Sequence, residues 1–419
     1  MAITQGELAR RIRAAREACQ MTQEEVADHL EISRATISQM EQGRRGVSSL
    51  ELHRLAHLYG RNLQDFLEED YPEGEAVMAL FRRQSGVSAD TEVLDSLRQC
   101  VTLGREITNL ERRLGLDRGL ATIPIYPVPP PDSKWDAVQQ GSLVAAKERH
   151  RLNLGDAPLP DVVDLLEGQG IRTAQVDLPD DISGLTLIDA RHGMLVAVNR
   201  QHHVLRRRFS CAHEYAHVLL DREIRGMLSR SSDRSNLNEV RANAFAASFL
   251  MPQNAVRSFV HGLAKGRPSR GQMDVYDGES ALHVEGRMEP GSQDIQMHDL
   301  VRLAHHFNVS RTAMLYRLKG LRIIDESERT RLAAEDKVGR GRVISEILGL
   351  PEPDHKTARN QFHSRFLSLG IEALRREAIT RSKLRELVQL AAPERDADAL
   401  LEKAGLGEIE PVDVMRGEC

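Results

Sequence analysis

The segment FSCAHEYAHVLLD carries His213 and His217 four residues apart, with Glu214 directly after the first histidine. Residues four positions apart share one face of a helix, so the two imidazoles can reach the same metal ion. Zinc lowers the pKa of a bound water towards neutrality, and a neighbouring carboxylate can accept the released proton. This spacing therefore predicts a zinc centre that hydrolyses a peptide bond, with Glu214 as the base.

A catalytic zinc usually takes three protein ligands and leaves one position open. The candidate third ligand is Glu239, which begins a second predicted helix in NEVRANAFAASFLMP. Asn243 shares its face four residues later and can orient a ligand by a hydrogen bond. The alternatives for the third ligand rank lower, because two precede the helix in a turn and one lies just one turn past His217: His202, His203 and Asp221.

The alternative without a metal is an amphipathic helix that carries surface histidines. Most other positions of this helix are apolar: Phe209, Ala212, Ala216, Val218, Leu219 and Leu220. This composition predicts that His213, Glu214 and His217 are partly buried. Buried polar groups without partners are costly, and a metal ion satisfies them.

Cys211 could be a fourth ligand or a redox switch. It lies two residues before His213 and so points away from the ligand face, which favours a buried core thiol.

A second pattern lies in MTQEEVADHLEISRATISQMEQGRR. Thr22 and Glu25 form a capping-box pattern that opens one helix, and Ser33 is a good N-cap for the next. This second helix has the spacing of a recognition helix in the DNA major groove. The residues expected to face base edges are Arg34, Ala35, Thr36, Ser38 and Gln39. Those expected to contact phosphate are Gln23, Arg44 and Arg45.

The charge of this N-terminal part leaves a second interpretation open. Residues 1–70 contain no lysine and more acidic than basic side chains, so the helix-turn-helix could instead make only protein contacts. A single module also has a small footprint on DNA, and we therefore expect a homodimer on a double-stranded operator.

Composition limits the class of protein. The 419 residues exceed one ordinary core, and an aromatic fraction of 4% favours helical cores of Leu, Ala, Val and Ile. The formal net charge of −5 confines any nucleic-acid contact to a local patch. The four cysteines are scattered, and neither an apolar signal core nor a membrane-length apolar run is seen. We therefore expect a cytoplasmic protein without a membrane partner.

The elements that must position these residues predict a mainly α chain with a small β-sheet. The strings IRTAQVDL, SGLTLID and GMLVAVN have the features of strands. We expect a helix-turn-helix bundle, a helical connector, a Pro-rich linker, an α+β hydrolase domain, a flexible polar loop and a helical C-terminal region. Their predicted ranges are 1–70, 71–117, 118–133, 134–263, 264–294 and 295–419.

Two further helix-turn-helix spacings occur in the C-terminal region, with Ser310 and Thr380 as N-caps. Both are interpreted as packing or substrate-docking elements. Basic side chains nearby leave DNA contact open as the other option: Arg311, Arg317, Lys319, Arg381 and Lys383.

The strings RRRFSCAHEYAHVLL and EVRANAFAASFLMP resemble the ImmA/IrrE family of metallopeptidases over roughly residues 140–260. The later string HHFNVSRTAMLYRLKGLRII is similar to the helical tail of that family. The resemblance implies a zincin-like fold with zinc on His213, His217 and Glu239, and Glu214 as catalytic base. Tyr215 and Ala216 stand where Leu-Gly is common, and the 264–294 loop is longer than usual.

Residues 7–67 resemble the Cro/C1-type (XRE) helix-turn-helix.

Together the resemblances imply a DNA-binding zinc metalloendopeptidase that regulates transcription. Members of the ImmA/IrrE family typically cleave a helix-turn-helix repressor, so a repressor, an antitoxin or the chain itself is the expected substrate, in a stress, phage or toxin–antitoxin setting. The alternative is a transcriptional regulator whose zincin domain is a sensor or a structural module. Glu214 favours the enzyme, because a metal that only supports folding does not need that carboxylate. A further hypothesis is that residues 264–294 gate the cleft or are themselves cleaved.

Overall fold

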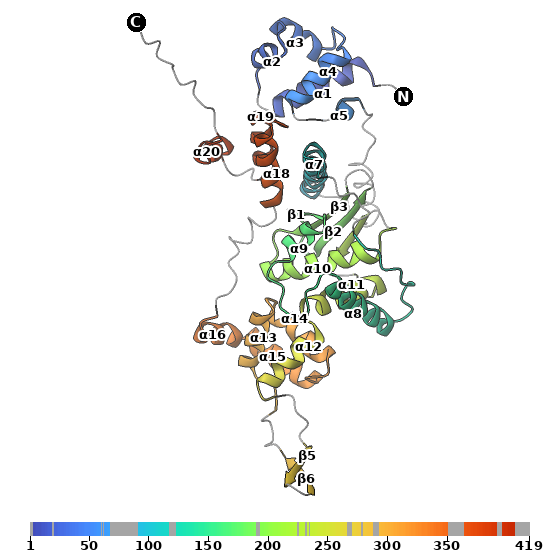
Figure 1. Ribbon diagram of the computed structural model, residues 1–419, viewed down its shortest axis with the longest axis vertical. Helices are drawn as coiled ribbons and strands as arrows, with labels where there is room; N and C mark the ends of the chain where they lie inside the picture. The colour runs from blue at the N-terminus through green and yellow to red at the C-terminus, as the bar shows by residue number, and fades with distance from the viewer. Residues whose placement is uncertain are drawn as a thin grey trace, which may run out of the picture. The chain divides into compact units, whose positions relative to one another are not determined.

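The two ends of the chain fold into one unit and the middle folds into another. The computed structural model describes residues 3–18, 21–59, 61, 63–67, 91–116, 123–189, 193–223, 226–230, 233, 235–265, 270–277, 280–287, 293–350, 364–391 and 396–406. The first unit comprises Met1–Ala121, Ala190–Gly193 and Phe362–Cys419. The second comprises Thr122–Asp189 and Met194–Gln361. The mainly helical fold with one small mixed sheet is as predicted (Figure 1).

The first unit begins with five helices around one apolar core. They are α1 (Gln5–Ala18), α2 (Gln23–Leu30), α3 (Arg34–Glu41), α4 (Ser49–Leu58) and α5 (Leu63–Leu67). The core includes Val26, Ile37, Met40, Leu55 and Tyr59. The predicted caps are present: Thr22 and Glu25 form a capping box, and the Ser33 hydroxyl accepts a hydrogen bond from the Thr36 amide. Local capping therefore determines where the two helices of the motif begin.

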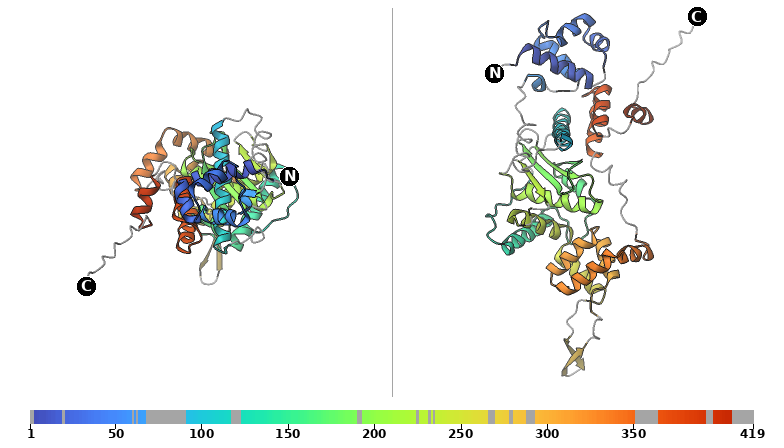
Figure 2. Two further views of the ribbon diagram at one scale, coloured as in Figure 1. Left: turned by 90° about the horizontal axis from the view of Figure 1, so that it is seen from above. Right: turned by 180° about the vertical axis from the view of Figure 1, so that it is seen from behind.

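Helices from the far end of the sequence complete this unit. They are α18 (Ser364–Arg375), α19 (Arg381–Ala391) and α20 (Ala397–Lys403), and α18 and α19 contact α7 (Thr91–Arg113) (Figure 2). The region expected as one helical part, 295–419, is thus divided between the two units. Helix α7 lies in the expected connector 71–117, of which residues 71–90 and 117 lie outside the described residues. Thr380 caps α19 as predicted, accepting a hydrogen bond from the Lys383 amide at 3.2 Å.

Ion pairs tie these C-terminal helices to the N-terminal part of the first unit. The fully buried Lys383 ammonium lies 3.0 Å from Glu106 on α7. Arg61, which follows α4, pairs with Glu386 of α19 at 3.0 Å. The Thr380 hydroxyl also donates to the Leu58 carbonyl at 3.1 Å. Because buried charges are stable only when paired, this set specifies how the two ends of the chain pack.

The second unit contains a four-stranded sheet in the order β1-β3-β2-β4. The strands are β1 (Arg172–Val176), β2 (Ile182–Asp189), β3 (Gly193–Asn199) and β4 (Gly226–Arg230). The first three match the predicted strand strings. β1 pairs with β3 in parallel, and β2 pairs with β4 antiparallel with a register shift between Ile182 and Gly184. This arrangement leaves β2 inside the sheet, next to the helix that carries the histidines.

Five helices accompany the sheet: α8 (Lys134–Arg151), α9 (Val162–Gly168), α10 (Val204–Leu220), α11 (Leu237–Leu250) and α12 (Gln253–Gly262). Helix α10 packs against β2 and α11, and α11 packs closely against α8. Gly141 permits the last contact, because a Cβ there would clash with the Arg241 carbonyl. Tyr215, Phe245 and Phe249 form an aromatic cluster between α10 and α11. The site helices are therefore held rigidly by their apolar faces.

The Pro-rich segment is attached to neighbouring helices over the residues that the structure describes. Residues 123–131 have no regular structure, as their prolines require, but the Tyr126 amide donates to the Leu219 carbonyl at 3.0 Å. The Tyr126 hydroxyl donates to the buried Glu148 at 2.7 Å, and Tyr215 bonds the same carboxylate. These contacts attach the segment to α10 and α8.

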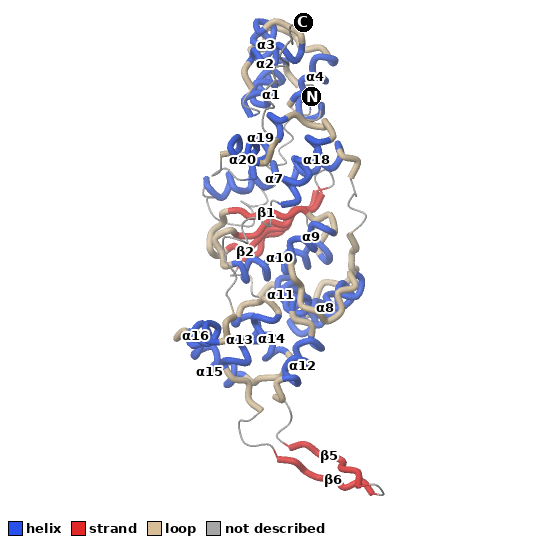
Figure 3. The backbone as a smooth tube through the Cα atoms, turned by 60° about the vertical axis from the view of Figure 1, so that its left-hand side comes forward, coloured by secondary structure: helices blue, strands red, loops and turns tan. Residues whose placement is uncertain are grey.

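Two stretches of the segment expected as a flexible loop, 264–294, have regular structure. Strands β5 (Arg270–Asp277) and β6 (Ser280–Arg287) form an antiparallel hairpin there (Figure 3). Polar and Gly-rich composition concealed an alternating pattern, in which Met273 is paired with Val284 and Val275 with Leu282. The Asp-Gly pair at 277–278 is itself a hairpin signal.

The rest of the second unit is a helical group: α13 (Met297–His306), α14 (Arg311–Gly320), α15 (Glu326–Lys337) and α16 (Arg340–Ile347). Ser310 caps α14 as predicted, accepting from the Ala313 amide at 3.1 Å. Arg317 donates to the Met251 carbonyl at 2.9 Å, so it serves in packing. In the part of the chain that the structure describes, no helix is long and apolar enough to cross a membrane.

Candidate metal centre

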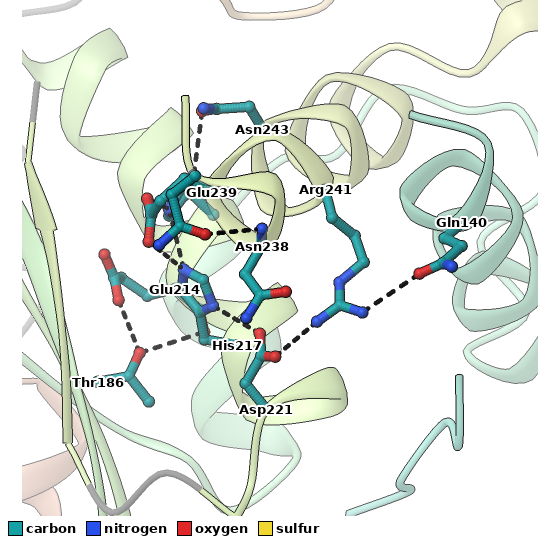
Figure 4. Close-up of polar contacts among 11 residues, drawn as sticks. Gln140, Thr186, Glu214, His217, Asp221, Asn238, Glu239, Arg241 and Asn243 are labelled. Carbon is teal, nitrogen blue, oxygen red and sulfur yellow. Dashed lines mark hydrogen bonds and ion pairs between the residues drawn. The ribbon is translucent and has the colours of Figure 1, made fainter. Parts of the chain in front are cut away.

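Helix α10 presents His213 and His217 on one buried face, one turn apart. Their Nε2 atoms lie 3.1 Å from each other, and the side chains are almost or completely inaccessible to solvent. Figure 4 shows His217 between Glu239 and Asp221. The predicted burial of the motif follows from its neighbours, because residues 211–219 of α10 are all buried. The helix thus delivers both imidazoles to one point inside the protein.

Helix α11 brings Glu239 to the same point. Asn236 caps this helix by accepting from the Asn238 amide, which places Glu239 in the first turn. Its Oε2 lies 3.1 Å from Nε2 of His213, and its Oε1 lies 3.4 Å from Nε2 of His217. The three residues are buried and each offers a ligand atom within 4.8 Å of the others. The structure therefore brings together the three residues that the sequence selected as ligands.

The hydrogen bonds at the Nδ1 atoms explain why this group fits a cation. Nδ1 of His213 lies 3.0 Å from the Asn243 amide oxygen, and Nδ1 of His217 lies 2.8 Å from Asp221. Both oxygens can accept a hydrogen bond from Nδ1, so Nε2 is the atom of each imidazole that is placed to bind a metal ion at the shared point. Around a tetrahedral zinc with bonds of 2.0–2.1 Å, ligand atoms are separated by about 3.3 Å. The observed separations agree with this geometry.

The electrostatics of the site favour positive charge at its centre. Burial alone disfavours the charged forms, but hydrogen bonds to Asp221 and Glu239 raise the pKa of His217 to about 10. Burial likewise opposes ionisation of Glu239, yet the two histidines lower its pKa to about 2. The negative charge of Asp221 and Glu239 beside the two imidazoles therefore favours binding of a divalent cation at this point.

Glu214 faces the sheet beside this centre. Its Oε2 accepts a hydrogen bond of 2.7 Å from the Thr186 hydroxyl on β2. Its Oε1 is fully buried and has no hydrogen-bond partner among the described residues. Gly184 on β2 makes room for it, because a Cβ there would lie 2.8 Å from that oxygen. Sequence reasoning assigned no role to Gly184 or Thr186, although both lie in the predicted strand SGLTLID.

The competing ligand candidates have other contacts. Asp221 pairs with Arg241 at 2.6 Å as well as with His217, so it supports a ligand instead of completing the set. His202 lies 3.1 Å from the Asp180 carbonyl, and His203 caps α10. Cys211 is buried and is not a member of the metal-binding group, in keeping with a core thiol.

A cavity of about 200 Å³ opens beside the centre. It is lined by two of the three ligand residues and by mostly polar side chains of β2, α10, β4, α11 and the segment after β4: Ser183, Arg206, Phe209, Ser210, His213, Arg230, Asp233, Glu239 and Asn243. The cavity therefore reaches the metal-binding group from the side of His213 and Glu239.

In the first unit, α3 presents the residues predicted to contact bases. Arg34, Ala35 and Gln39 are exposed, whereas Thr36 and Ser38 are half-buried. Thr36 lies 2.9 Å from the Ser33 hydroxyl. The outer face of this helix is thus available to a partner mainly through its first turn and Gln39.

The residues predicted to contact phosphate differ in their surroundings. Arg44 is exposed, but the Gln23 amide donates to Glu41 at 2.9 Å and Arg45 pairs with Glu51 at 2.8 Å. Gln23 and Arg45 are thus already engaged within the domain, and Arg44 is the candidate that is exposed and outside such a pair.

Comparison with known protein families finds two matches in the chain. Residues 7–67 match a helix-turn-helix domain, and residues 166–265 match the IrrE N-terminal-like domain, a peptidase family designated M78. No curated protein matches the chain. The second match includes α10 and α11 and hence every residue of the metal-binding group. The chain therefore carries an N-terminal helix-turn-helix domain and, in its second unit, an IrrE N-terminal-like domain of the M78 peptidase family.

Proposed function

We propose that this chain is a zinc-dependent endopeptidase that controls transcription together with its helix-turn-helix domain. The observation that carries the proposal is the pairing of two features in one buried site. Three electron-pair donors converge within 3.4 Å, and a carboxylate oxygen beside them has no partner among the described residues. A metal ion would bind the three donors, and the carboxylate oxygen would accept a proton during catalysis.

Zinc is the ion that we expect, because two imidazoles and one carboxylate with an open position form the usual catalytic set. When bound by His213, His217 and Glu239, it would supply Lewis acidity and an activated water. Asp221 and Asn243 orient the two imidazoles by accepting their Nδ1 protons. These hydrogen bonds keep each Nε2 free to act as a ligand.

Glu214 acts as the general base in this mechanism. Thr186 holds one of its oxygens, so Oε1 is the atom that accepts a proton. The same carboxyl group can then give the proton to the leaving amide nitrogen. Burial on the inner side of the sheet excludes bulk water from Glu214, which strengthens its interaction with charge that develops nearby.

The regulatory part of the proposal concerns the partners. The helix-turn-helix domain implies DNA binding, and the exposed first turn of α3 supports contact with an operator. Because a single module has a small footprint, we propose that the chain binds the operator as a homodimer. The substrate that we propose is a helix-turn-helix repressor, an antitoxin or a second copy of this chain. Cleavage would then change the expression of the genes under that operator.

The experiment that tests the enzyme is a cleavage assay of the full-length protein with zinc, against the product of the neighbouring gene. We expect about one zinc per chain, and we expect Glu214→Gln to retain zinc but to stop cleavage. Asp180→Asn, an exposed carboxylate outside the site, is the control. Equal cleavage by wild type and Glu214→Gln would contradict the proposal and favour a regulator whose metal centre is a sensor or structural.

A further inference from the structure

Among the residues that the structure describes, one arginine beside the metal centre makes no side-chain hydrogen bond or ion pair. Arg206 lines the cavity next to His213 and Glu239. It lies on α10 seven residues before His213, and Ser210 between them lines the same cavity. Intervals of four and three residues place side chains on one helix face. Arg206 therefore lies in line with the metal ligands, towards the N-terminus of α10.

The two neighbouring arginines differ from Arg206 in their contacts. Arg207 donates to the Gln175 side chain and is buried, and Arg208 donates to the carbonyls of Leu159 and Pro160. These contacts attach α10 to β1 and to the segment before α9. Arg206 is exposed and makes no side-chain hydrogen bond or ion pair with the residues that the structure describes. Packing thus accounts for Arg207 and Arg208 but not for Arg206.

Helix stability does not account for Arg206 either. It lies in the first turn of α10, which contains no acidic residue. The helix dipole places partial positive charge at this end, so a cation here is unfavourable. Arg206 therefore adds to the cavity lining a guanidinium group that no described carboxylate pairs with, and this charge favours an anionic group of a bound peptide.

We propose that Arg206 is a specificity-determining residue that binds an acidic side chain of the protein substrate close to the cleaved bond. This inference rests on the proposed peptidase function and names the substrate class for that site. A guanidinium group binds a carboxylate through two parallel hydrogen bonds, which gives geometric selectivity as well as affinity.

The helix geometry sets the distance of this subsite. Seven residues of helix span roughly 10 Å along the axis. An extended peptide advances roughly 3.3 Å per residue. The acidic side chain would therefore lie about three residues from the bond at the metal centre, on the side towards the N-terminus of α10.

A peptide library derived from a proteome tests the proposal without knowledge of the natural substrate. The full-length zinc protein is incubated with the library, and the residues around each cut are identified by mass spectrometry. We expect Asp and Glu to be enriched at one position within about three residues of the cut. Arg206→Ala should remove this enrichment, and Arg206→Glu should replace it with Lys and Arg. Arg302→Ala, an exposed arginine on α13, is the matched control.

Steady-state kinetics provide the magnitude. For a peptide with the preferred acidic residue, Arg206→Ala should lower kcat/KM about tenfold, and for its glutamine analogue it should change kcat/KM less than twofold. An unchanged cleavage profile for Arg206→Glu would overturn the proposal. So would an equal loss for the acidic and glutamine peptides, because that result indicates a structural role.

A binding arm separates this proposal from the proposed function. Immobilised full-length Glu214→Gln protein captures peptides from the same library without cutting them. Enrichment of acidic peptides that is lost in the Glu214→Gln, Arg206→Glu double variant supports Arg206, even if wild type cuts nothing and the peptidase proposal fails. Capture with no acidic preference overturns the role of Arg206 and leaves the peptidase proposal to its own assay.

Discussion

Nδ1 of His217 lies 2.8 Å from Oδ2 of Asp221, one turn further along α10. The other oxygen of this carboxylate is held by Arg241 at 2.6 Å, and Arg241 also donates to Gln140 on α8. The orientation of a metal ligand is therefore transmitted from α8 through α11 to α10. Such supporting hydrogen bonds orient the ligand and increase its affinity for the metal.

We expect Asp221→Asn to weaken zinc binding about 10- to 100-fold, because His217 loses a charged acceptor that fixes its tautomer. Competition with a chelator measures this affinity, and circular dichroism monitors the fold. Asp177→Asn, a carboxylate exposed at 49% in its pair with Arg200, is the control. Zinc affinity equal to wild type would show that Asp221 does not support the ligand.

We expect Gly184→Ala to abolish cleavage, because the new Cβ would lie 2.8 Å from Glu214 Oε1 and 2.9 Å from the Ala197 carbonyl. Over-packing of this kind also destabilises a protein by about 1–3 kcal/mol. Cleavage kinetics and thermal unfolding are measured together. Gly262→Ala is the matched control, since no atom lies within 4 Å of a Cβ at that position. Full activity in Gly184→Ala would mean that Glu214 tolerates displacement.

We expect Lys383→Met to destabilise the first unit by about 3–5 kcal/mol, because it leaves buried Glu106 without its partner at 3.0 Å. Urea unfolding followed by circular dichroism measures the change. Lys403→Met, an exposed lysine on α20, is the control. A loss below about 1 kcal/mol would show that the buried pair contributes little to the joining of the two chain ends.

The same pair predicts a dependence of stability on pH. Burial disfavours ionisation of Glu106, but Lys383 and Arg61 outweigh it and lower its pKa. A carboxyl group with a lowered pKa stabilises the fold above its unfolded pKa of about 4.3, and this contribution is lost as the pH falls through the folded value. We expect Lys383→Met to remove this acid-sensitive contribution. Parallel pH profiles of the free energy of unfolding for both proteins would contradict this assignment.

We expect Arg34→Ala and Gln39→Ala to weaken binding to the upstream promoter about tenfold each, because both side chains are exposed on α3, the helix that we predict to contact base edges. Gel-shift titration at fixed salt measures the affinity. Arg13→Ala is the control, since Arg13 is exposed on α1 and paired with Glu17. Unchanged shifts for both variants would favour a helix-turn-helix that makes only protein contacts.

The parts of this protein that depend on neighbours in the chain were accessible from its sequence. The four-residue spacing of His213 and His217 places them on one face of any helix, and Glu25 three residues after Thr22 defines a helix start. Helical periodicity also predicted that Asn243 shares one face of its helix with Glu239, and both residues lie on α11. Composition did not indicate the paired strands at residues 270–277 and 280–287, because a polar average conceals an alternating pattern.

What only the tertiary structure decided involves contacts between distant segments. Thr186 and Gly184 shape the surroundings of Glu214 because β2 packs beside α10, and no local spacing encodes that approach. Lys383 meets Glu106 although 276 residues lie between them, because burial of two opposite charges is stable only when they pair. Local hydrogen bonding and periodicity act over a few residues, whereas packing and charge pairing act through space, and these determine how the site is completed.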